Sequence, residues 1–396
     1  MHTFPTFRVT LSRTSLARPA KYRSSLPSLN AIPSLNTFST AHQRRGVVAG
    51  TMDTIKNTIA ENLGGIAPNL ATHQFSLDQV PDLTGKVAVV TGGSEGIGYG
   101  CTYTLLKHNI AKIFILSVSE EAVKSAKECI AKDLGQEAAN KTIWMQCDLS
   151  DWVKAKDVAE DIKKKTDRLD ILINNAGRGI MTYQLTDYGV DRHMAVNHMG
   201  HVILTSHLLP LLKKTAEKGD IVRISNQSSN LHQATPSDTK FESLEELNRD
   251  LGPNIQYGRS KLASILYSRF FTRTVTNAGY PKLLMNATHP GFVSTKMSKQ
   301  DIFEPYPLGG YAMAAGLEPF KKDQFQGAVS TMFAATYTQE SGQYICPSAV
   351  PEPGSTLSQD EALADRLMEL TWKIVKEKTK HESVDKGCPL DDLVSQ

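Results

Sequence analysis

A tyrosine and a lysine stand four residues apart in the stretch "NIQYGRSKLASILYSRF", residues 254–270. The pattern of this stretch predicts a helix, in which Tyr257 and Lys261 share one face and lie one turn apart. An ammonium held beside a phenol favours the phenolate, so the tyrosine becomes able to exchange a proton with a substrate near neutral pH. For the pair taken alone, an exposed helix face is the simpler explanation.

A second chemical feature is the glycine-rich stretch "TGGSEGIG", residues 91–98, which follows an apolar run. Glycines at this place allow a tight turn from a strand into a helix. They also let the backbone approach a pyrophosphate at the helix N-terminus. A tight turn that binds no ligand is the alternative. The dinucleotide contacts expected in this turn are Gly92, Ser94, Gly96, Ile97 and Gly98.

Polar residues also end two later apolar runs. Asp148, in "CDLS", is placed to accept a hydrogen bond from an adenine amino group, although a helix-capping aspartate explains the residue as simply. The stretch "NNAG", residues 174–177, ends the next run at the edge where parallel sheets bind ligands. The cofactor contacts expected at these strand ends are Asp148, Leu149, Asn175, Ala176 and Gly177.

The elements that must position these residues begin at about residue 86, where short apolar runs start to alternate with helical patterns. Most of the runs are continuous, as expected for strands that are buried on both faces of a parallel sheet. We therefore expect a single Rossmann-type α/β domain over residues 83–350, with a doubly wound parallel seven-stranded sheet flanked by helices. The expected strands are 86–93, 111–117, 141–148, 169–177, 220–229, 282–291 and 342–347.

Helical spacing of apolar residues returns near the C-terminus. The stretch "SQDEALADRLMELTWKIVKEKTK" opens with a capping box formed by Ser358 and Glu361. We expect a helix within residues 351–380 that packs on the domain, followed by a polar tail over residues 381–396.

The N-terminal residues differ in charge from the rest of the chain. Of the 44 lysines and arginines, seven precede Asp53, and no acid does, so the remaining 37 basic residues face 41 acidic ones. This mildly acidic body argues against a nucleic-acid partner. Residues 1–45 are rich in arginine and serine and lack a signal-peptide core, which predicts a mitochondrial presequence followed by an extension over 46–82. A disordered basic tail and a chloroplast leader are the alternatives.

Composition indicates neither a metal site nor a membrane span. The five cysteines are scattered without a C-x-x-C pair. Four histidines gather on one expected helix, but no carboxylate or cysteine pattern accompanies them, so we expect no metal there. These histidines are His193, His198, His201 and His207. No apolar run reaches the roughly 18 residues that crossing a bilayer requires.

Taken in order, these motifs resemble those of the short-chain dehydrogenase/reductase family. The pattern includes T-G-x-x-x-G-x-G at 91–98, N-N-A-G at 174–177, "VNHMG" around Asn197, "NQSSN" around Ser229, Y-x-x-x-K at 257–261 and P-G-x-V-x-T at 290–295. The likeness covers about residues 83–350. The stretch "ALADRLMELTWKIV" and the long spacer after Ser229 resemble the retinol-dehydrogenase-like branch. Together with the leader, the chain is most similar to the blue-light-induced mitochondrial oxidoreductases of fungi.

The resemblance implies a hydride transfer between a nicotinamide and a secondary alcohol or carbonyl compound. It implies that Tyr257 transfers the proton to or from the substrate. Lys261 would stabilise the phenolate and bind the nicotinamide ribose. Ser229, rather than Ser228, would donate a hydrogen bond to the substrate oxygen. Asn197 would hold a water that connects Lys261 to solvent, although a plain amide on a helix surface is the alternative. Val293 and Thr295 would contact the nicotinamide carboxamide. The resemblance also allows a homo-oligomer.

Two choices stay open at this point. Cofactor preference between NAD and NADP depends on the end of the second strand, where Ser117 and Val118 are neither acidic nor basic, and the branch resemblance leans towards NADP. Glu95 stands where NADP users often carry a base. Three loops are expected to cover the site, residues 178–190, 230–256 and 296–313, and their apolar residues fit an apolar small-molecule substrate. A catalytically silent dinucleotide-binding redox sensor and an isomerase or dehydratase are the alternative functions.

Overall fold

The computed structural model of the chain describes residues 75–291, 293 and 323–379, which all belong to one compact unit within residues 49–396. Several expectations fall outside the described residues. They concern the presequence 1–45, the extension as far as residue 74, Thr295, the loop 296–313 and the tail 381–396.

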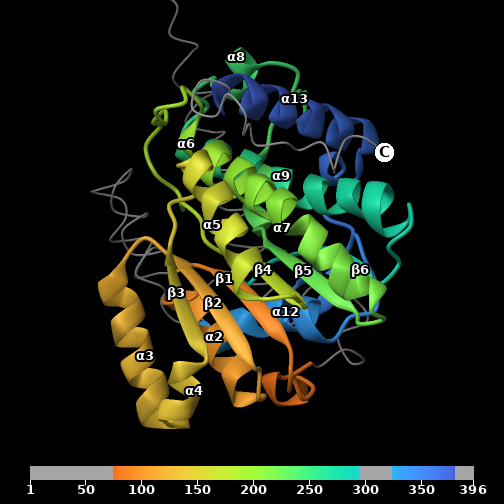
Figure 1. The fold of residues 1–396 in the computed structure, drawn as a ribbon. Coiled ribbons are helices and arrows are strands. Elements are labelled where there is room, and N and C mark those ends of the chain that lie inside the picture. The colour runs from red at the N-terminus through yellow and green to blue at the C-terminus, as the bar shows by residue number, and fades with distance from the viewer. Residues whose placement is uncertain (1–74, 292, 294–322, 380–396) are drawn as a thin grey trace, which may run out of the picture. The chain divides into compact units, whose positions relative to one another are not determined.

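The strands form one sheet in the order β3-β2-β1-β4-β5-β6-β7-β8 (Figure 1). All neighbouring pairs from β3 to β7 are parallel, so the doubly wound α/β architecture is confirmed. The chain reverses its direction of winding between β3 and β4, which leaves β1 and β4 side by side at the switch point. The strands are β1 (Val87–Thr91), β2 (Lys112–Ser117), β3 (Thr142–Gln146), β4 (Ile171–Asn174), β5 (Val222–Gln227), β6 (Leu283–Thr288), β7 (Tyr344–Cys346) and β8 (Val350–Glu352).

The sheet has eight strands, so the expected number of seven is wrong by one. All seven expected runs contain a strand, and β8 is the addition. It pairs antiparallel with β7, with Pro351 opposite Ile345. A proline inside a three-residue segment argues against a strand in the sequence, but it is tolerated on an edge strand, where its missing N–H costs no hydrogen bond inside the sheet.

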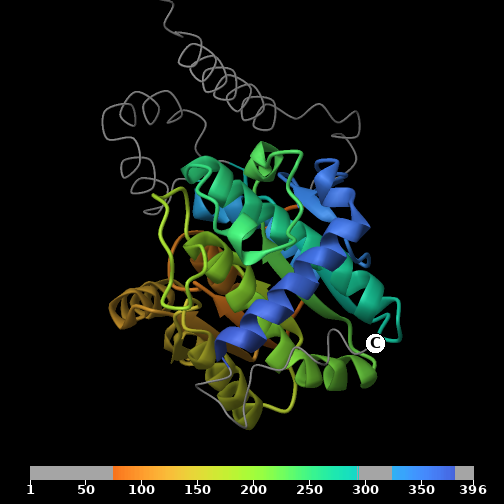
Figure 2. The same ribbon diagram turned by 90° about the horizontal axis from the view of Figure 1, so that it is seen from above.

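Helices cover both faces of the sheet (Figure 1). One layer contains α2, α3 and α12, the other contains α5, α7 and α9, and α13 packs against α9 (Figure 2). Within the described ranges, no helix is both long enough and apolar enough to cross a membrane. The helices are α2 (Gly96–Lys107), α3 (Glu120–Leu134), α4 (Gln136–Asn140), α5 (Trp152–Lys165), α6 (Arg192–Met194), α7 (Gly200–Glu217), α8 (Leu244–Leu247), α9 (Pro253–Phe271), α12 (Gln324–Thr336) and α13 (Glu361–Thr379).

Several single turns complete the chain. Among the described residues, three are 3₁₀ turns and two are π-helical turns that continue or precede longer helices. The 3₁₀ turns are η1 (Leu77–Gln79), η3 (Asn230–Ala234) and η6 (Leu357–Gln359), and the π-helical turns are η2 (Ala195–Met199) and η4 (Thr272–Thr276).

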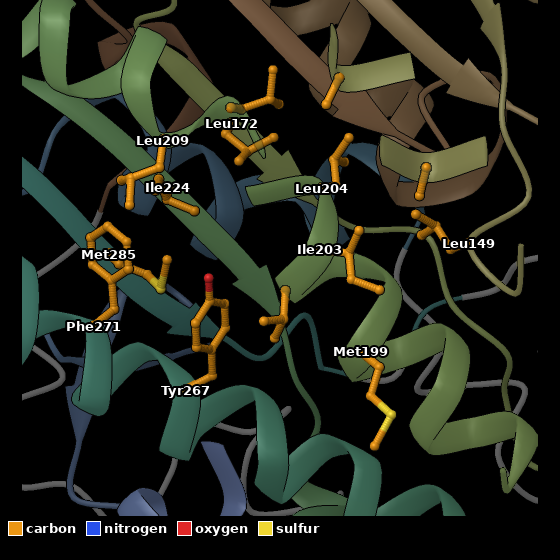
Figure 3. Packing of buried hydrophobic residues seen from close by; sticks show 14 of the residues in the cluster. Leu149, Leu172, Met199, Ile203, Leu204, Leu209, Ile224, Tyr267, Phe271 and Met285 are labelled. Atoms are coloured by element: carbon orange, nitrogen blue, oxygen red, sulfur yellow. The ribbon is translucent and has the colours of Figure 1, made fainter. Parts of the chain in front are cut away.

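Two hydrophobic cores lie on opposite faces of the sheet, because successive side chains of a strand point to opposite faces. Val87 and Val89 of β1 enter the core under α5, α7 and α9, whereas Ala88 and Val90 enter the core under α2 and α12. Figure 3 shows the first core, in which strand and helix side chains such as Leu172, Ile224 and Leu209 meet. This burial on both faces explains why the strands read as continuous apolar runs.

Helices α9 and α13 begin in different ways. Helix α9 begins at Pro253, whose fixed φ suits the first turn, and it contains the expected helix over 254–270. Helix α13 begins at Glu361, but its cap is Asp360, which accepts a hydrogen bond from Leu363 N at 2.9 Å. The expected capping box is therefore wrong. The Ser358 hydroxyl instead donates to Ser355 O at 2.6 Å within the preceding turn.

Candidate active site

The turn between β1 and α2 has the backbone that its glycines predict. Gly92 and Gly96 adopt φ values of +64° and +53°, in the region that favours glycine. A Cβ on Gly98 would stand 2.1 Å from Gly92 O, so only glycine lets the helix approach the strand this closely. The side chain of the N-cap residue, Glu95, makes no capping hydrogen bond to the first turn of α2. The amides of that first turn therefore fit a diphosphate group.

Thr91 joins this turn to the end of β4. Its Oγ1 accepts hydrogen bonds from the backbone N–H groups of Asn175 and Ala176, both at 2.9 Å. Asn175 Nδ2 donates in return to Thr91 O at 3.0 Å. Thr91 was not among the expected site residues. Its position at the start of the glycine motif was the signal that could have identified it.

The end of β2 is polar and carries no acid. Ser94 Oγ donates to Ser117 Oγ at 3.2 Å, and Ser119 N donates to the same oxygen at 3.3 Å. Val118 is 58% exposed, an unusual state for a valine beside a core strand. At the end of β3, the Asp148 Oδ1 atom accepts hydrogen bonds from Ser150 N and Oγ. Asp148 therefore closes a local turn and does not cap α5, whose cap is Asp151, which accepts a hydrogen bond from Lys154 N at 2.9 Å.

Leu149 packs through its backbone as well as through its buried side chain. A Cβ on Gly200 would stand 2.3 Å from Leu149 O, so the loop after β3 packs directly on the N-terminus of α7. This packing holds the loop next to the turn η2, which carries Asn197.

Tyr257 and Lys261 lie one turn apart on α9, as expected. Lys261 Nζ lies 5.4 Å from the centroid of the Tyr257 ring and donates to Gln227 O at 2.8 Å. The lysine is 4% exposed, and its burial lowers the pKa of the ammonium to about 8. The cation therefore persists at neutral pH, although burial reduces its affinity for the proton.

Asn197 lies in the π-helical turn η2 and is 3% exposed, so the alternative of a helix-surface amide is wrong. Its side chain makes two hydrogen bonds to the backbone of Arg178, in the loop after β4. Oδ1 accepts from Arg178 N at 2.7 Å, and Nδ2 donates to Arg178 O at 2.9 Å. Nδ2 also donates to Ser260 Oγ at 2.9 Å. A Cβ on Gly177 would stand 2.9 Å from Asn197 Oδ1 and 3.6 Å from Lys261 Nζ. Gly177, Asn197 and Lys261 thus converge.

The two adjacent serines after β5 have different surroundings. Ser228 Oγ donates to Lys261 O at 2.8 Å, and this bond joins the end of β5 to α9. Ser229 caps the turn η3, where its Oγ accepts from Leu231 N at 3.2 Å. The same hydroxyl donates to Asn230 Oδ1 at 3.4 Å. This hydrogen bond is long, so an acceptor on a ligand can replace it.

The four histidines are buried and lie along α6, η2 and α7, which follow one another without a break from Arg192 to Glu217. His201 Nε2 lies 2.9 Å from Thr91 Oγ1, and His198 Nε2 lies 2.9 Å from Thr371 Oγ1. Burial lowers the pKa of His198 to about 3 and that of His201 to about 4, so both are neutral hydrogen-bonding groups at physiological pH. Over the described residues, no group of three histidines, cysteines or acids is arranged to hold a metal.

The nicotinamide end of the expected site is described only in part. Val293 is buried, and a Cβ on Gly327 would stand 2.6 Å from Val293 Cγ2. This contact places the chain after β6 against α12. Two of the loops expected around the substrate, residues 178–190 and 230–256, are joined to each other. Tyr183 Oη of the first donates to Asn248 O of the second at 2.7 Å. Arg259 of α9 holds the second loop through a 3.0 Å bond to Glu246.

Known proteins match this chain over most of its length. Residues 86–237 match the family described as short chain dehydrogenase. The chain is 61% identical over 371 residues to bli-4 of Neurospora crassa, whose name describes a mitochondrial oxidoreductase, and the match covers 92% of this chain and 90% of that protein. It is 29% identical to the polyprenol dehydrogenase of Danio rerio, with 77% of this chain and 90% of that protein covered.

A solved structure of an uncharacterized protein from Mycobacterium paratuberculosis has the same fold. Its TM-score is 0.57 at 24% identity, over 76% of this chain and 97% of that one. The sequence matches show that the chain belongs to the short-chain dehydrogenase/reductase family of oxidoreductases.

Proposed function

We propose that the protein is an NAD(P)-dependent oxidoreductase that interconverts a secondary alcohol and a carbonyl compound. The observation that carries this proposal is the convergence of Tyr257, Lys261, Asn197 and Gly177 beside the glycine turn. Convergence of a proton donor, a cation and a diphosphate-binding turn at one sheet edge has no structural purpose of its own.

In this proposal a bound nicotinamide cofactor supplies or accepts the hydride. Tyr257 donates a proton to the substrate oxygen or removes one from it. Lys261 stabilises the phenolate and binds the nicotinamide ribose, while Ser229 donates a hydrogen bond to the substrate oxygen. Asn197 keeps the loop after β4 in place next to Lys261 and remains our candidate to hold a relay water. The proposed cofactor contacts are Gly92, Ser94, Gly96, Ile97, Gly98, Ser117, Asp148, Leu149, Asn175, Ala176, Gly177, Tyr257, Lys261, Val293 and Thr295.

NADP is the cofactor that we favour. An acid at the end of the second strand would bind the ribose 2′-hydroxyl and repel a 2′-phosphate, and β2 ends instead in Ser117, followed by the exposed Val118. The hydroxyl of Ser117 is already close to the Ser94 hydroxyl and to Ser119 N. This cluster of small donors suits an oxygen-rich anion.

The substrate that we propose is an apolar alcohol or carbonyl compound. Met181, in the loop after β4, is 8% exposed and belongs to the loop that Tyr183 fastens to Asn248. A similar protein, the polyprenol dehydrogenase of Danio rerio, is named for a long apolar alcohol. A mitochondrial location is supported by the leader composition and by the name of bli-4. Deletion of residues 1–45 tests the location, and unchanged import would refute it.

The experiment that tests the activity is Tyr257→Phe. The change removes only a hydroxyl, so turnover on a panel of carbonyl substrates should fall by at least about 10²-fold while cofactor affinity stays nearly constant. Cofactor binding is measured by fluorescence titration of the same preparation. Near-normal turnover in this variant would refute the mechanism. Cofactor binding without turnover of any substrate by the wild type would favour a silent redox sensor.

A further inference from the structure

His232 is a buried histidine, and the mechanism above gives it no role. It follows Ser229 by three residues and lies in the turn η3, with no measurable exposure. Its Nδ1 atom lies 2.8 Å from Ser229 O. Its Nε2 atom lies 3.0 Å from Ser355 N, which belongs to a segment more than a hundred residues later. The imidazole therefore bridges the peptide of Ser229 and the C-terminal part of the chain.

The chemistry of these two contacts assigns the tautomer. Ser229 O is a carbonyl oxygen and can only accept, so Nδ1 must carry a hydrogen. Ser355 N–H can only donate, so Nε2 must offer its lone pair. An imidazolium would place two N–H groups opposite each other at Ser355. His232 is therefore neutral, with its hydrogen on Nδ1.

The segment that supplies Ser355 is itself fastened to the helix of Tyr257. We call residues 353–359 the C-terminal strap. Arg269 of α9 donates to Pro353 O at 2.8 Å and to Ser358 O at 2.7 Å. Gly354 adopts a φ of +75°, and a Cβ there would stand 2.6 Å from Ser358 Oγ and 3.4 Å from His232 Nε2. The strap thus packs closely on the imidazole edge.

The ring of His232 is also held in its plane. The Tyr344 ring of β7 packs edge-to-face against it, with centroids 4.9 Å apart at 73°. A ring with both nitrogen atoms bonded and one face covered has a single orientation. The Ser229 peptide is consequently held by a rigid group rather than by a mobile one.

We propose that His232 is a positioning residue that orients Ser229 towards the substrate oxygen by joining its peptide to the C-terminal strap. The inference rests on the proposed function, because it assumes that Ser229 binds that oxygen. The backbone carbonyl of Ser229 fixes the ψ angle of the residue and therefore limits where its hydroxyl can point. Leu231 N, which bonds the same hydroxyl, provides the second restraint.

Three variants test the proposal. His232→Phe removes both hydrogen bonds, and we expect kcat to fall about 10- to 100-fold, the effect of a small misplacement of a catalytic group, while the cofactor Kd changes less than about twofold. His232→Asn retains a donor that can reach Ser229 O, and we expect kcat to recover to within about fivefold of the wild type. His207→Asn is the matched control, because His207 is another buried histidine but its Nδ1 atom lies 3.3 Å from Glu160 Oε1 of α5. Its kcat should match the wild type.

A spectroscopic measurement provides an answer that does not depend on turnover. The ¹⁵N shifts of labelled histidine in the full chain, assigned by comparison with His232→Asn, should show a protonated Nδ1 and an unprotonated Nε2 for His232. The opposite tautomer would overturn the inference. Provided that Tyr257→Phe is inactive, a wild-type kcat in His232→Phe would also overturn the inference. Equal losses of kcat in His232→Phe and His232→Asn would overturn it as well. Activity that survives in Tyr257→Phe would instead refute the proposed function and, with it, the role given to Ser229.

Discussion

The two sides of the candidate site are built by different means. The cofactor side, formed by the β1–α2 turn and the end of β4, depends on glycines, backbone amides and the side chains of Thr91 and Asn175. The catalytic side, formed by η2, η3 and α9, depends on buried polar side chains that bond to one another's backbones. Lys261 bonds to Gln227 O, and Ser228 bonds to Lys261 O.

This difference agrees with what each side is proposed to bind. A diphosphate is recognised by amides and a helix N-terminus, which any sequence can provide if the backbone approaches closely enough. Proton transfer needs particular side chains held within tenths of an ångström, and buried polar atoms remain in place only when their hydrogen bonds are satisfied. The cofactor side should therefore be sensitive to added atoms, and the catalytic side to lost hydrogen bonds and altered charge.

The largest expected effect comes from adding one methyl group to each side. A Cβ at Gly98 would stand 2.1 Å from Gly92 O, and a Cβ at Gly258 would stand 2.4 Å from Leu231 O. Both are backbone atoms, so we expect each alanine to lower the free energy of unfolding by about 3 kcal/mol in denaturant titrations. Gly98→Ala should weaken cofactor binding above all, whereas Gly258→Ala should lower kcat by displacing η3 from α9.

Gly135→Ala controls for backbone strain without a clash. Gly135 has a φ of +90°, and a methyl group added there would have no neighbour within 4 Å, so only about 1 kcal/mol should be lost, with normal binding and kcat. If Gly98→Ala and Gly258→Ala damaged cofactor binding and kcat in the same proportion, the distinction between the two sides would not hold.

A smaller effect concerns the buried charge of Lys261. Burial lowers its pKa from 10.5 to about 8, so between about pH 8 and 10.5 the unfolded chain binds more protons than the folded one. The free energy of unfolding contributed by this group therefore rises with pH across that window, and below about pH 8 the folded state bears the full cost of the buried ammonium. Lys261→Met should be more stable than the wild type at pH 7, by about 1 to 3 kcal/mol.

Activity should respond in the opposite direction. Because Lys261 carries its charge only below about pH 8, turnover and cofactor affinity of the wild type should fall as the pH rises through that value, and Lys261→Met should be inactive throughout. Lys156→Met replaces another buried lysine, on α5, and should leave the pH profile unchanged. A wild-type profile that stays flat from pH 7 to 9 would show that this ammonium has no part in binding or turnover.

The sequence predicted the strand, glycine turn and helix of the cofactor side, because these elements depend on local backbone requirements. A strand, a glycine turn and a helix occur within Val87–Lys107, and the Tyr257–Lys261 pair lies within one helix, so near neighbours in the chain carry both signals. The parallel sheet followed from the same local patterns. Of the strands in the sheet, only β8 was not predicted, because Pro351 argues against a strand in the sequence.

The rest of the catalytic side could not be predicted, because its bonds join distant segments. Lys261 meets Gln227 O, His232 meets Ser355 N, and no local pattern specifies either contact. The π-helical turn that turns Asn197 inward likewise depends on packing rather than on propensity. The same limit explains why the predicted capping box of α13 is wrong. The Ser358 hydroxyl donates to Ser355 O, and Asp360 caps the helix instead.

The smallest expected effect is a change of cofactor preference at the end of β2. Ser117→Asp places a carboxylate where Ser94 Oγ and Ser119 N now approach the hydroxyl, so it should repel a 2′-phosphate and bind a 2′-hydroxyl. Because the position is partly exposed, we expect a shift of only about tenfold towards NAD in the ratio of the two dissociation constants. Val118→Arg should shift the ratio towards NADP, since its side chain already points into solvent. Ser125→Asp adds the same charge to the exposed face of α3 and should leave the ratio unchanged. Equal ratios in Ser117→Asp, Val118→Arg and the wild type would mean that the adenosine ribose binds elsewhere, and the cofactor side would then extend less far along the sheet edge than its backbone geometry suggests.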